Sequence, residues 1–295
     1  MTTITPRTID VAGLPVRRSL PTAAAREVGP WVFMDHIGPH MFASGTGVDV
    51  IPHPHISLAT VTYLFDGELV HRDSIGTVQP IRPGAINLMV AGRGIAHSER
   101  SGPERRIAPH QAHGLQLWHA LPEANEEDEP AFHHYAAEKL PATTIAADTT
   151  ARVMIGVAFG LASPVKTYCQ TLFAEVRTQG AATIELPDDH EQLAVYVVSG
   201  GAVLGKETLQ SAQLGVFERG ESVPELRVEE RAHLVVLGGE SVGKRYMWWN
   251  FVSSRIERIQ QAKADWSAGR FGTVIDDTDE HTPLPAEDAH SRMKE

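Results

Sequence analysis

The chain has one cysteine, Cys169, in 295 residues, so no disulfide can form within it. It also lacks a basic excess, because 26 lysines and arginines stand against 37 acidic residues, a formal net charge of −11. No apolar run approaches the roughly 20 residues that span a bilayer, and residues 1–7 show no basic and apolar leader pattern. We therefore expect a soluble cytoplasmic protein that binds neither nucleic acid nor membranes directly.

Helical periodicity is scarce as well, and short apolar runs alternate with turns along most of the chain. Residues 60–65 are rich in β-branched and aromatic side chains and end at Asp66-Gly67, a dipeptide typical of a hairpin turn. Residues 115–118 alternate apolar and polar side chains, as a half-buried strand does. With 25 glycines and 19 prolines available to form turns, the pattern predicts an all-β protein, a sandwich or a barrel.

Histidine is concentrated in the first half of the chain, where 11 of the 15 lie at or before His134. One residue separates His53 from His55, and one residue separates His97 from Glu99. Side chains two positions apart in a strand point to the same face, so each pair projects from one face of its strand. If the two strands meet across a barrel, three imidazoles and one carboxylate converge on one point.

Three neutral nitrogens and one anionic oxygen are a ligand set that suits a divalent transition metal. We therefore predict one metal site formed by His53, His55, His97 and Glu99, with Glu99 also available as a base. The set can close around tetrahedral zinc as a structural site. It can equally hold octahedral iron with two positions left for water, substrate or dioxygen, and nickel, manganese and copper are further alternatives.

Other polar residues near these motifs are expected to have supporting roles. His71, Arg72 and Asp73 follow the predicted hairpin and are expected to form a hydrogen-bonded cluster, at the surface or beside the ligands, rather than to bind the metal. Gln116 and Trp118 alternate on one predicted strand, so one of them can face the pocket, and core packing is the expected role of Trp118.

An internal repeat indicates two tandem barrels. Residues 63–70, Tyr-Leu-Phe-Asp-Gly-Glu-Leu-Val, align with residues 196–203, Tyr-Val-Val-Ser-Gly-Gly-Ala-Val, and the rhythm of strands matches around both. We predict a first domain over residues 1–145 that binds the metal and a second over residues 146–295. The second copy has Leu186 and Asp188 where the first has His53 and His55, so we expect it to bind no metal.

Three segments outside the barrels have recognisable patterns. Residues 254–257, Ser-Arg-Ile-Glu, match a helix capping box, and the apolar spacing behind them predicts a helix over about 254–268. The acidic, proline-flanked stretch 121–130 is expected to be a solvated loop that closes the first barrel. The polar, acidic tail from Asp276 is expected to be poorly ordered.

The first half of the chain resembles the pirin family, a two-barrel branch of the cupins. The segments that carry the resemblance are Phe33-Met-Asp-His-Ile-Gly-Pro39, His53-Pro-His55, Thr60-Val-Thr-Tyr63, Gly67-Glu68, His71-Arg-Asp-Ser74, Pro83-Gly84, Met89-Val-Ala-Gly-Arg-Gly-Ile-Ala-His97-Ser-Glu99 and Gly114-Leu-Gln-Leu-Trp118. The resemblance is specific from about Arg18 to Tyr135 and weaker in the second half. It implies an all-β fold of two tandem cupin domains, each a jelly-roll β-barrel, with a C-terminal helix.

The resemblance also implies a site and a function. His53, His55, His97 and Glu99 match the metal ligands of the family residue for residue, and the resemblance favours Fe(II) as the metal. Some pirins cleave the flavonol quercetin with dioxygen, which implies a quercetin 2,3-dioxygenase-like enzyme acting on a small aromatic substrate. Others act as non-enzymatic, iron-dependent regulators that bind a transcription regulator or a metabolic enzyme, and this is the alternative.

Two departures from the family pattern concern the neighbourhood of the ligands. Position 60 is threonine where cupins ordinarily have a glutamate after His-x-His, so the carboxylate ligand has to come from elsewhere, and Glu99 can supply it. Many pirins have Arg-Gly-Phe-Glu after His-x-His, whereas this chain has Ile-Ser-Leu-Ala at residues 56–59. We therefore expect the shape of the pocket and the substrate preference to differ from those relatives.

Overall fold

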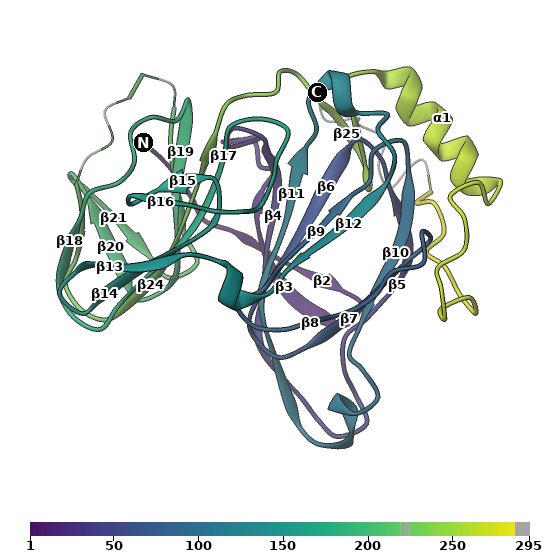
Figure 1. Ribbon diagram of the computed structural model, residues 1–295, viewed down its shortest axis with the longest axis horizontal. Helices are drawn as coiled ribbons and strands as arrows, with labels where there is room; N and C mark the ends of the chain where they lie inside the picture. The colour runs from purple at the N-terminus through teal and green to yellow at the C-terminus, as the bar shows by residue number, and fades with distance from the viewer. Residues whose placement is uncertain (219, 222, 224, 287–295) are drawn as a thin grey trace. The chain divides into compact units, whose positions relative to one another are not determined.

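The computed structural model describes all residues except 219, 222, 224 and 287–295. Among the described residues the structure is almost entirely β, with one α-helix, α1 (Ile256–Ser267), near the C-terminus (Figure 1). This confirms the predicted all-β fold class with a C-terminal helix. No described helix is both long and apolar enough to cross a bilayer.

Contacts between Cα atoms divide the chain into two compact units. Unit 1 comprises residues 1–8, 17–36 and 135–241, and unit 2 comprises residues 9–16, 37–134 and, of its last segment, the described residues 242–286. The N-terminal residues thus belong to the unit that contains residues 135–241, and α1 belongs to the unit that contains residues 37–134. The division at residues 145 and 146 stays a prediction.

Unit 2 is built around a four-stranded antiparallel sheet and the greater part of a seven-stranded one. The larger sheet has the order β12 (Ala131–Tyr135), β9 (Ile86–Val90), β6 (Leu58–Asp66), β11 (His110–Ala120), β4 (Trp31–Phe42), β3 (Leu14–Leu20) and β2 (Arg7–Val11). The smaller sheet has the order β5 (Asp49–His55), β10 (Ile95–Arg100), β7 (Leu69–Asp73) and β8 (Val78–Ile81). A further ribbon, β25 (Tyr246–Trp248) and β26 (Phe251–Ser253), precedes α1, and the short 3₁₀ helices are η1 (Arg105–Ile107) and η2 (Glu123–Asn125).

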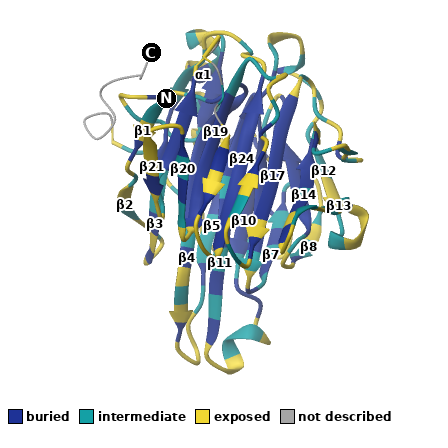
Figure 2. Ribbon diagram, turned by 90° about the vertical axis from the view of Figure 1, so that its left-hand side faces the viewer, coloured by how far each residue is buried: buried dark blue, intermediate teal, exposed yellow. Residues whose placement is uncertain are grey.

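Unit 1 repeats the pattern of a seven-stranded and a four-stranded sheet. The larger sheet has the order β1 (Thr2–Ile4), β22 (Leu214–Phe217), β19 (Gln192–Ser199), β24 (Ala232–Gly239), β17 (Thr171–Thr178), β14 (Thr149–Ile155) and β13 (Ala142–Ala146). The smaller has β18 (Ala182–Ile184), β23 (Leu226–Val228), β20 (Gly201–Leu204) and β21 (Glu207–Gln210); β15 (Val157–Ala158), β16 (Leu161–Ala162) and η3 (Ala137–Lys139) lie outside both. β17, β19 and β24 are buried along most of their length (Figure 2), because their apolar side chains form the core of this unit.

The internal repeat read from the sequence corresponds to equivalent strand–turn–strand segments in the two units. The two strands of each segment lie in different sheets, so the hairpin predicted at Asp66-Gly67 is wrong, although a turn is present there. β6 turns into β7 through Gly67, and β19 turns into β20 through Gly200. Both glycines have a left-handed backbone, with φ of 94° and 85°. A Cβ at Gly67 would lie 2.3 Å from a backbone oxygen, and one at Gly200 would lie 2.6 Å from another, so both turns require glycine.

Helix α1 is capped differently from the prediction. It begins at Ile256, and neither Ser254 nor the preceding Arg255 caps it with a side chain, so the predicted capping box is wrong. Instead, the carboxylate of Glu126 accepts hydrogen bonds from the backbone N–H of Ser254 at 2.7 Å and from the hydroxyl of Ser253 at 2.8 Å. A distant acidic side chain therefore satisfies the polar groups ahead of the helix.

Glu126 also corrects the description of residues 121–130 as a solvated loop. It is 1% exposed, and its Oε1 lies 3.0 Å from Nε of Arg245, which is also buried. Its neighbour Glu127 does face solvent and pairs with Arg255 and Arg258 of the segment that begins α1. The loop therefore attaches the C-terminal segment to unit 2 through a buried carboxylate.

The acidic tail is ordered further than the sequence suggested. Asp277 and Glu280 both pair with Arg100, and the backbone N–H of Thr282 donates to the carbonyl of Pro52 on β5 at 2.7 Å. The expectation of a poorly ordered tail is therefore wrong for residues 276–286, and the rest of it lies outside the described residues.

A buried ionic group in unit 1 gives a prediction for stability against pH. Glu175 on β17 pairs with His233 of β24 at 2.6 Å and with Arg177 at 2.7 Å. Burial opposes its ionisation, but hydrogen bonds and charges of these partners outweigh burial and lower the pKa of Glu175 to about 2. Burial lowers the pKa of His233, so Arg177 is the permanent positive partner at neutral pH.

Because the folded pKa of Glu175 lies below its unfolded value, its contribution to stability is complete above about pH 4.5 and declines as the pH falls toward 2. Its full size is on the order of 3 kcal/mol. We expect E175Q to be less stable than the wild type by this order at pH 7, and the difference to shrink between pH 5 and pH 3. Urea unfolding of both proteins over this range measures it, and a difference that stays constant with pH would contradict the assignment.

Candidate metal centre

Two adjacent strands bring the predicted histidine ligands together. β10 pairs antiparallel with β5, with His97 opposite His53 and Ile95 opposite His55. The ring centroids of His53 and His97 are 4.3 Å apart, and that of His55 lies 5.0 Å from each. One potential ligand atom from each ring lies within 4.8 Å of the others. The strands are thus hydrogen-bonded neighbours in one sheet, and do not meet across a barrel.

Hydrogen bonds at Nδ1 orient two of the three rings. Nδ1 of His53 lies 2.9 Å from the carbonyl oxygen of Ile51, and Nδ1 of His55 lies 3.1 Å from the carbonyl oxygen of Asn250. A carbonyl oxygen only accepts, so each ring carries a proton on Nδ1 and presents the lone pair of Nε2. This is the tautomer that binds a metal through Nε2.

The third ring has a nitrogen that the protein alone does not satisfy. His97 is completely buried, and its Nε2 has no hydrogen-bond partner. Buried polar atoms are rarely left unpaired in proteins, so an unpaired nitrogen beside two other imidazoles fits a role as a metal ligand. The donor set therefore fits a divalent transition metal.

Burial keeps these histidines neutral, which metal binding requires. Burial lowers the pKa of His53 to about 4 and lowers the pKa of His55 and of His97 well below the usual value. Deprotonated imidazole is the form that ligates metals, so little proton competition is expected at neutral pH.

Glu99 lies on the same strand as His97, beyond an irregularity in register between the two. It is 7% exposed, and its Oε1 accepts a hydrogen bond from the hydroxyl of Thr62 at 2.8 Å. Burial raises the pKa of Glu99, partly opposed by that hydrogen bond. Glu99 does not belong to the group of three histidines whose ligand atoms lie within 4.8 Å, so its role as the fourth ligand stays a prediction.

Gln116 extends the contact to Glu99. Its side-chain amide lies 2.8 Å from the hydroxyl of Thr62. The contacting atom of Gln116 is Oε1, so the hydroxyl of Thr62 lies between the Gln116 amide and the Glu99 carboxylate. Of the two residues suggested by the sequence, Gln116 contacts Thr62, which in turn contacts the carboxylate of Glu99. Trp118 lies edge-on against His55, with ring centroids 5.0 Å apart.

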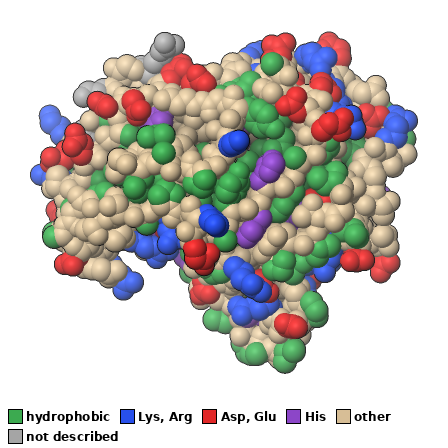
Figure 3. Space-filling model, in the orientation of Figure 1, with side chains coloured by type: hydrophobic (Ala, Val, Ile, Leu, Met, Phe, Trp, Pro, Cys, Tyr) green, Lys and Arg blue, Asp and Glu red, His purple; other side chains and the backbone are tan. Residues whose placement is uncertain are grey.

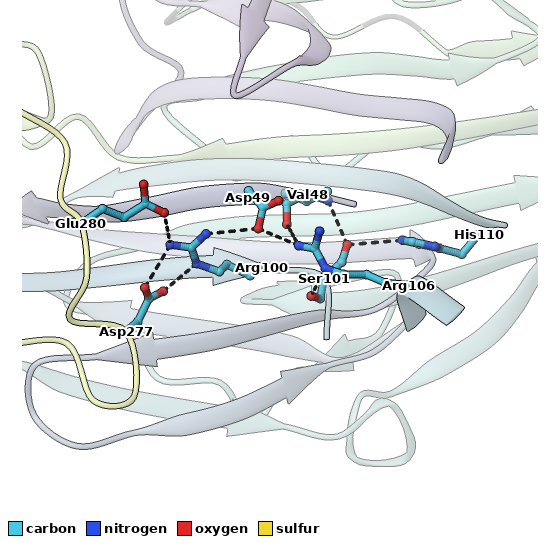
Figure 4. A network of polar contacts seen from close by, with 8 residues as sticks. All are labelled: Val48, Asp49, Arg100, Ser101, Arg106, His110, Asp277 and Glu280. Atoms are coloured by element: carbon cyan, nitrogen blue, oxygen red, sulfur yellow. Dashed lines mark hydrogen bonds and ion pairs between the residues drawn. The ribbon is translucent and has the colours of Figure 1, made fainter. Parts of the chain in front are cut away.

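Arg100, the next residue after Glu99, ties the ligand strand to the C-terminal segment (Figure 4). Its guanidinium pairs with Asp277 at 2.7 Å, with Glu280 at 2.8 Å and with Asp49 of β5 at 3.1 Å. The hydrogen bond that Arg100 donates to Asp277 contributes most to a raised pKa of Arg100. This network joins β10, β5 and the chain after α1 directly behind the ligands.

An apolar cluster supports the ligand strands from the side away from the metal site. Ile56 follows His55 and Ala96 precedes His97, and both pack in a cluster with Phe251, Ile259 and Ala262. The side chain of Ile56 thus supports the strand from its core side, although the sequence suggested that residues 56–59 shape the pocket. The backbone of Asn250 and the cluster around α1 were not predicted, since no local pattern indicates such distant contacts.

Comparison with known sequences decides the family. The sequence model of the pirin family matches residues 13–119, and that of the pirin C-terminal cupin domain matches residues 173–272. A pirin-like protein of Caulobacter vibrioides is 42% identical over 279 residues, covering 94% of this chain and 96% of that protein. This chain belongs to the pirin family. The resemblance inferred from the histidine motifs is thereby confirmed, as are the two cupin domains of a pirin.

Further relatives extend the comparison. Human pirin is 30% identical over 268 residues, covering 88% of this chain and 89% of the human protein. Among solved structures, the crystal structure of a quercetin 2,3-dioxygenase from Acinetobacter baumannii superposes with a TM-score of 0.89 at 30% identity, covering 97% of this chain and 95% of that chain. The pirin bicupin fold therefore applies over nearly the whole chain.

Proposed function

We propose that this pirin is a metal-dependent dioxygenase that cleaves a flavonol such as quercetin at one site formed by His53, His55, His97 and Glu99. The observation that carries the proposal is the convergence of three neutral imidazoles, two of them buried, with Nε2 of His97 unpaired. The similarity to a quercetin 2,3-dioxygenase over nearly the whole chain supports the substrate class. Fe(II) is the proposed metal, with zinc, nickel, manganese and copper as the alternatives to be tested.

Each residue of the proposed site would have a separate role in the reaction. The three imidazoles would hold the metal, which when bound supplies Lewis acidity and coordination positions for the substrate and dioxygen. Glu99 would accept the proton of the flavonol hydroxyl as a general base, because it is a buried carboxylate on the strand that carries His97. Thr62 would hold one carboxylate oxygen of Glu99 through its hydroxyl, leaving the other oxygen free.

The ligand assignment predicts one tightly bound metal ion per chain. Replacing His53 or His97 by alanine should abolish tight binding, since each removes one of three converging nitrogens. The measurement is metal content by mass spectrometry after loading apo protein with Fe(II), without oxygen, or with Zn(II). His190→Ala and His233→Ala in unit 1 are the matched controls and should retain the metal. If the wild type bound a second equivalent of metal and either control variant lost it, the assignment would be contradicted.

The enzymatic proposal is tested by oxygen uptake. Protein loaded anaerobically with Fe(II) is mixed with quercetin, other flavonols and enediol-like compounds, and oxygen consumption is followed beside the metal-free H97A variant. We expect uptake with at least one flavonol and none with H97A. If the loaded wild type consumes no oxygen with any of them, the dioxygenase proposal is wrong and regulation of a protein partner becomes the proposal.

Two surface features bear on that alternative. Acidic and basic side chains are interspersed on the face drawn in Figure 3. Met41 and Ile107 are 61% and 76% exposed, and the hydroxyl of Ser44 donates to the carbonyl of Ile107, so the two segments lie together.

A further inference from the structure

The sheet face that carries the ligands carries another pair of polar side chains on β7. β7 pairs antiparallel with β10, with Asp73 opposite His97 and His71 opposite Glu99. Cross-strand partners share a face, so His71 and Asp73 project to the same side as the ligands. Their side chains are 2% and 0% exposed, which rules out the surface position that the sequence left open.

These side chains form a continuous series of contacts that ends on His97. Nε2 of His71 lies 3.0 Å from Oδ2 of Asp73, and Nδ1 of His71 lies 3.4 Å from Nδ1 of His97. Phe132 stacks on the ring of His71 with centroids 4.4 Å apart, which fixes the plane of that ring. The series therefore runs from a carboxylate, through one imidazole, to Nδ1 of His97, the ring whose Nε2 has no partner.

The chemistry of donors and acceptors decides where the protons lie. Burial opposes ionisation of Asp73, but hydrogen bonds from His71 and Thr77 outweigh it, so the pKa of Asp73 lies below its usual value. An ionised carboxylate only accepts, so His71 carries a proton on Nε2 and, when neutral, presents a lone pair at Nδ1. His97 then carries its own proton on Nδ1, because two facing lone pairs would repel.

We propose that Asp73 and His71 are positioning residues that set the tautomer of His97, so that its Nε2 lone pair faces the metal. Backbone carbonyls perform this task for His53 and His55, whereas His97 depends on a side-chain series. The inference rests on the proposed metal site. Asp73 and His71 do not bind the metal themselves, but they contribute to its affinity by orienting His97.

Asp73→Asn is the most direct test, because asparagine keeps the shape of the side chain but places an N–H donor where aspartate has an acceptor oxygen. Oδ1 of Asp73 accepts the backbone N–H groups of Thr77 at 2.8 Å and Ile75 at 3.1 Å, so an asparagine keeps its oxygen there. Its amide nitrogen then donates to Nε2 of His71. His71 must carry its proton on Nδ1, and His97 must carry its proton on Nε2, the nitrogen that should bind the metal.

Two measurements follow the change. In the metal-free protein, nitrogen-15 NMR of the imidazole rings should find the proton of His97 on Nδ1 in the wild type and on Nε2 in D73N. Zinc affinity, measured by competition with a chromophoric chelator, should fall by about 10–100-fold in D73N. Cobalt(II) absorption in the loaded protein reports whether the coordination geometry is retained. A merely structural change of the strand would not selectively move the proton of His97 from one ring nitrogen to the other.

Matched variants separate positioning from folding. D66N is the control, because Asp66 also caps a turn in unit 2, through the N–H of Gly67 and the amide of Gln111, away from any histidine ligand. D66N should bind zinc as the wild type does. H71L should lose affinity as D73N does, whereas H71N, whose amide oxygen can replace Nδ1 as the acceptor for His97, should recover most of it.

The outcomes distinguish this inference from the site on which it rests. If the wild type fails to bind zinc, or H53A binds as well as the wild type, the metal site itself is wrong. If the wild type binds zinc and D73N matches D66N, the positioning role is wrong and the site stands. If D73N does not fold, the tautomer of His97 in the wild type and the contrast between H71N and H71L decide, and a proton on Nε2 in the wild type overturns the proposal.

Discussion

Replacing Glu99 by glutamine is expected to lower flavonol turnover far more than it lowers metal affinity. Glutamine keeps the length of the side chain and an oxygen that can accept the hydrogen bond of Thr62, but it loses the charge and nearly all the basicity. A positioned general base is worth about 10²–10⁴-fold in rate. The kcat of iron-loaded E99Q should therefore fall by this factor, measured as oxygen consumption with quercetin at matched iron content.

The partial loss of metal expected in E99Q has to be separated from the loss of the base. Turnover is therefore expressed per bound iron, and E129Q serves as a control, since Glu129 is an exposed carboxylate of the same unit that pairs with Arg93. E129Q should turn over as the wild type does. If E99Q also does so per bound iron, Glu99 is not the base, whatever the reaction of the enzyme.

The sequence predicts the fold class well because β-structure here is encoded locally. Alternating side chains and turn glycines mark the turns at Gly67 and Gly200, and the structure has a tight left-handed turn at both. The similarity of the two segments around these turns revealed the tandem arrangement. Membership of the compact units depends instead on which distant segments pack together, which no local pattern encodes, as the assignment of α1 to unit 2 shows.

The three histidines of the site were also readable from spacing alone, because alternation fixes which side chains share a face of a strand. What the spacing could not give is the pairing of the strands. β5 and β10 are neighbours in register, with His53 opposite His97, and a register irregularity follows before Glu99. The carbonyl of Asn250, 195 residues from His55, is equally inaccessible to local reasoning.

The prediction from composition that residues 121–130 form a solvated loop was the one most clearly corrected by the structure. An acidic, proline-flanked stretch ordinarily faces solvent, and Glu127 does so with 46% of its side chain exposed. Its neighbour Glu126 is buried because Arg245, distant in sequence, offers a charge, and Ser253 offers a hydroxyl. A buried charge requires partners, and composition cannot show where a partner lies.

Glu126→Gln is accordingly expected to destabilise unit 2 strongly. The substitution leaves the buried guanidinium of Arg245 without its countercharge, and it weakens the hydrogen bonds that hold the chain ahead of α1. Removing one partner of a buried ion pair typically costs about 3–5 kcal/mol. Urea unfolding followed by tryptophan fluorescence measures it, because four of the five tryptophans lie in this unit.

Glu127→Gln is the matched control, one residue away and in contact with Arg255 and Arg258 at the surface. Exposed ion pairs are worth about 0–1 kcal/mol, so E127Q should stay close to the wild type. Because α1 packs Ile259 and Ala262 against Ile56 and Ala96, beside His55 and His97, E126Q should also weaken zinc binding and E127Q should not. Equal stability of the two variants would mean that the Glu126 carboxylate does not anchor the helix, and that the ligand strands are held without it.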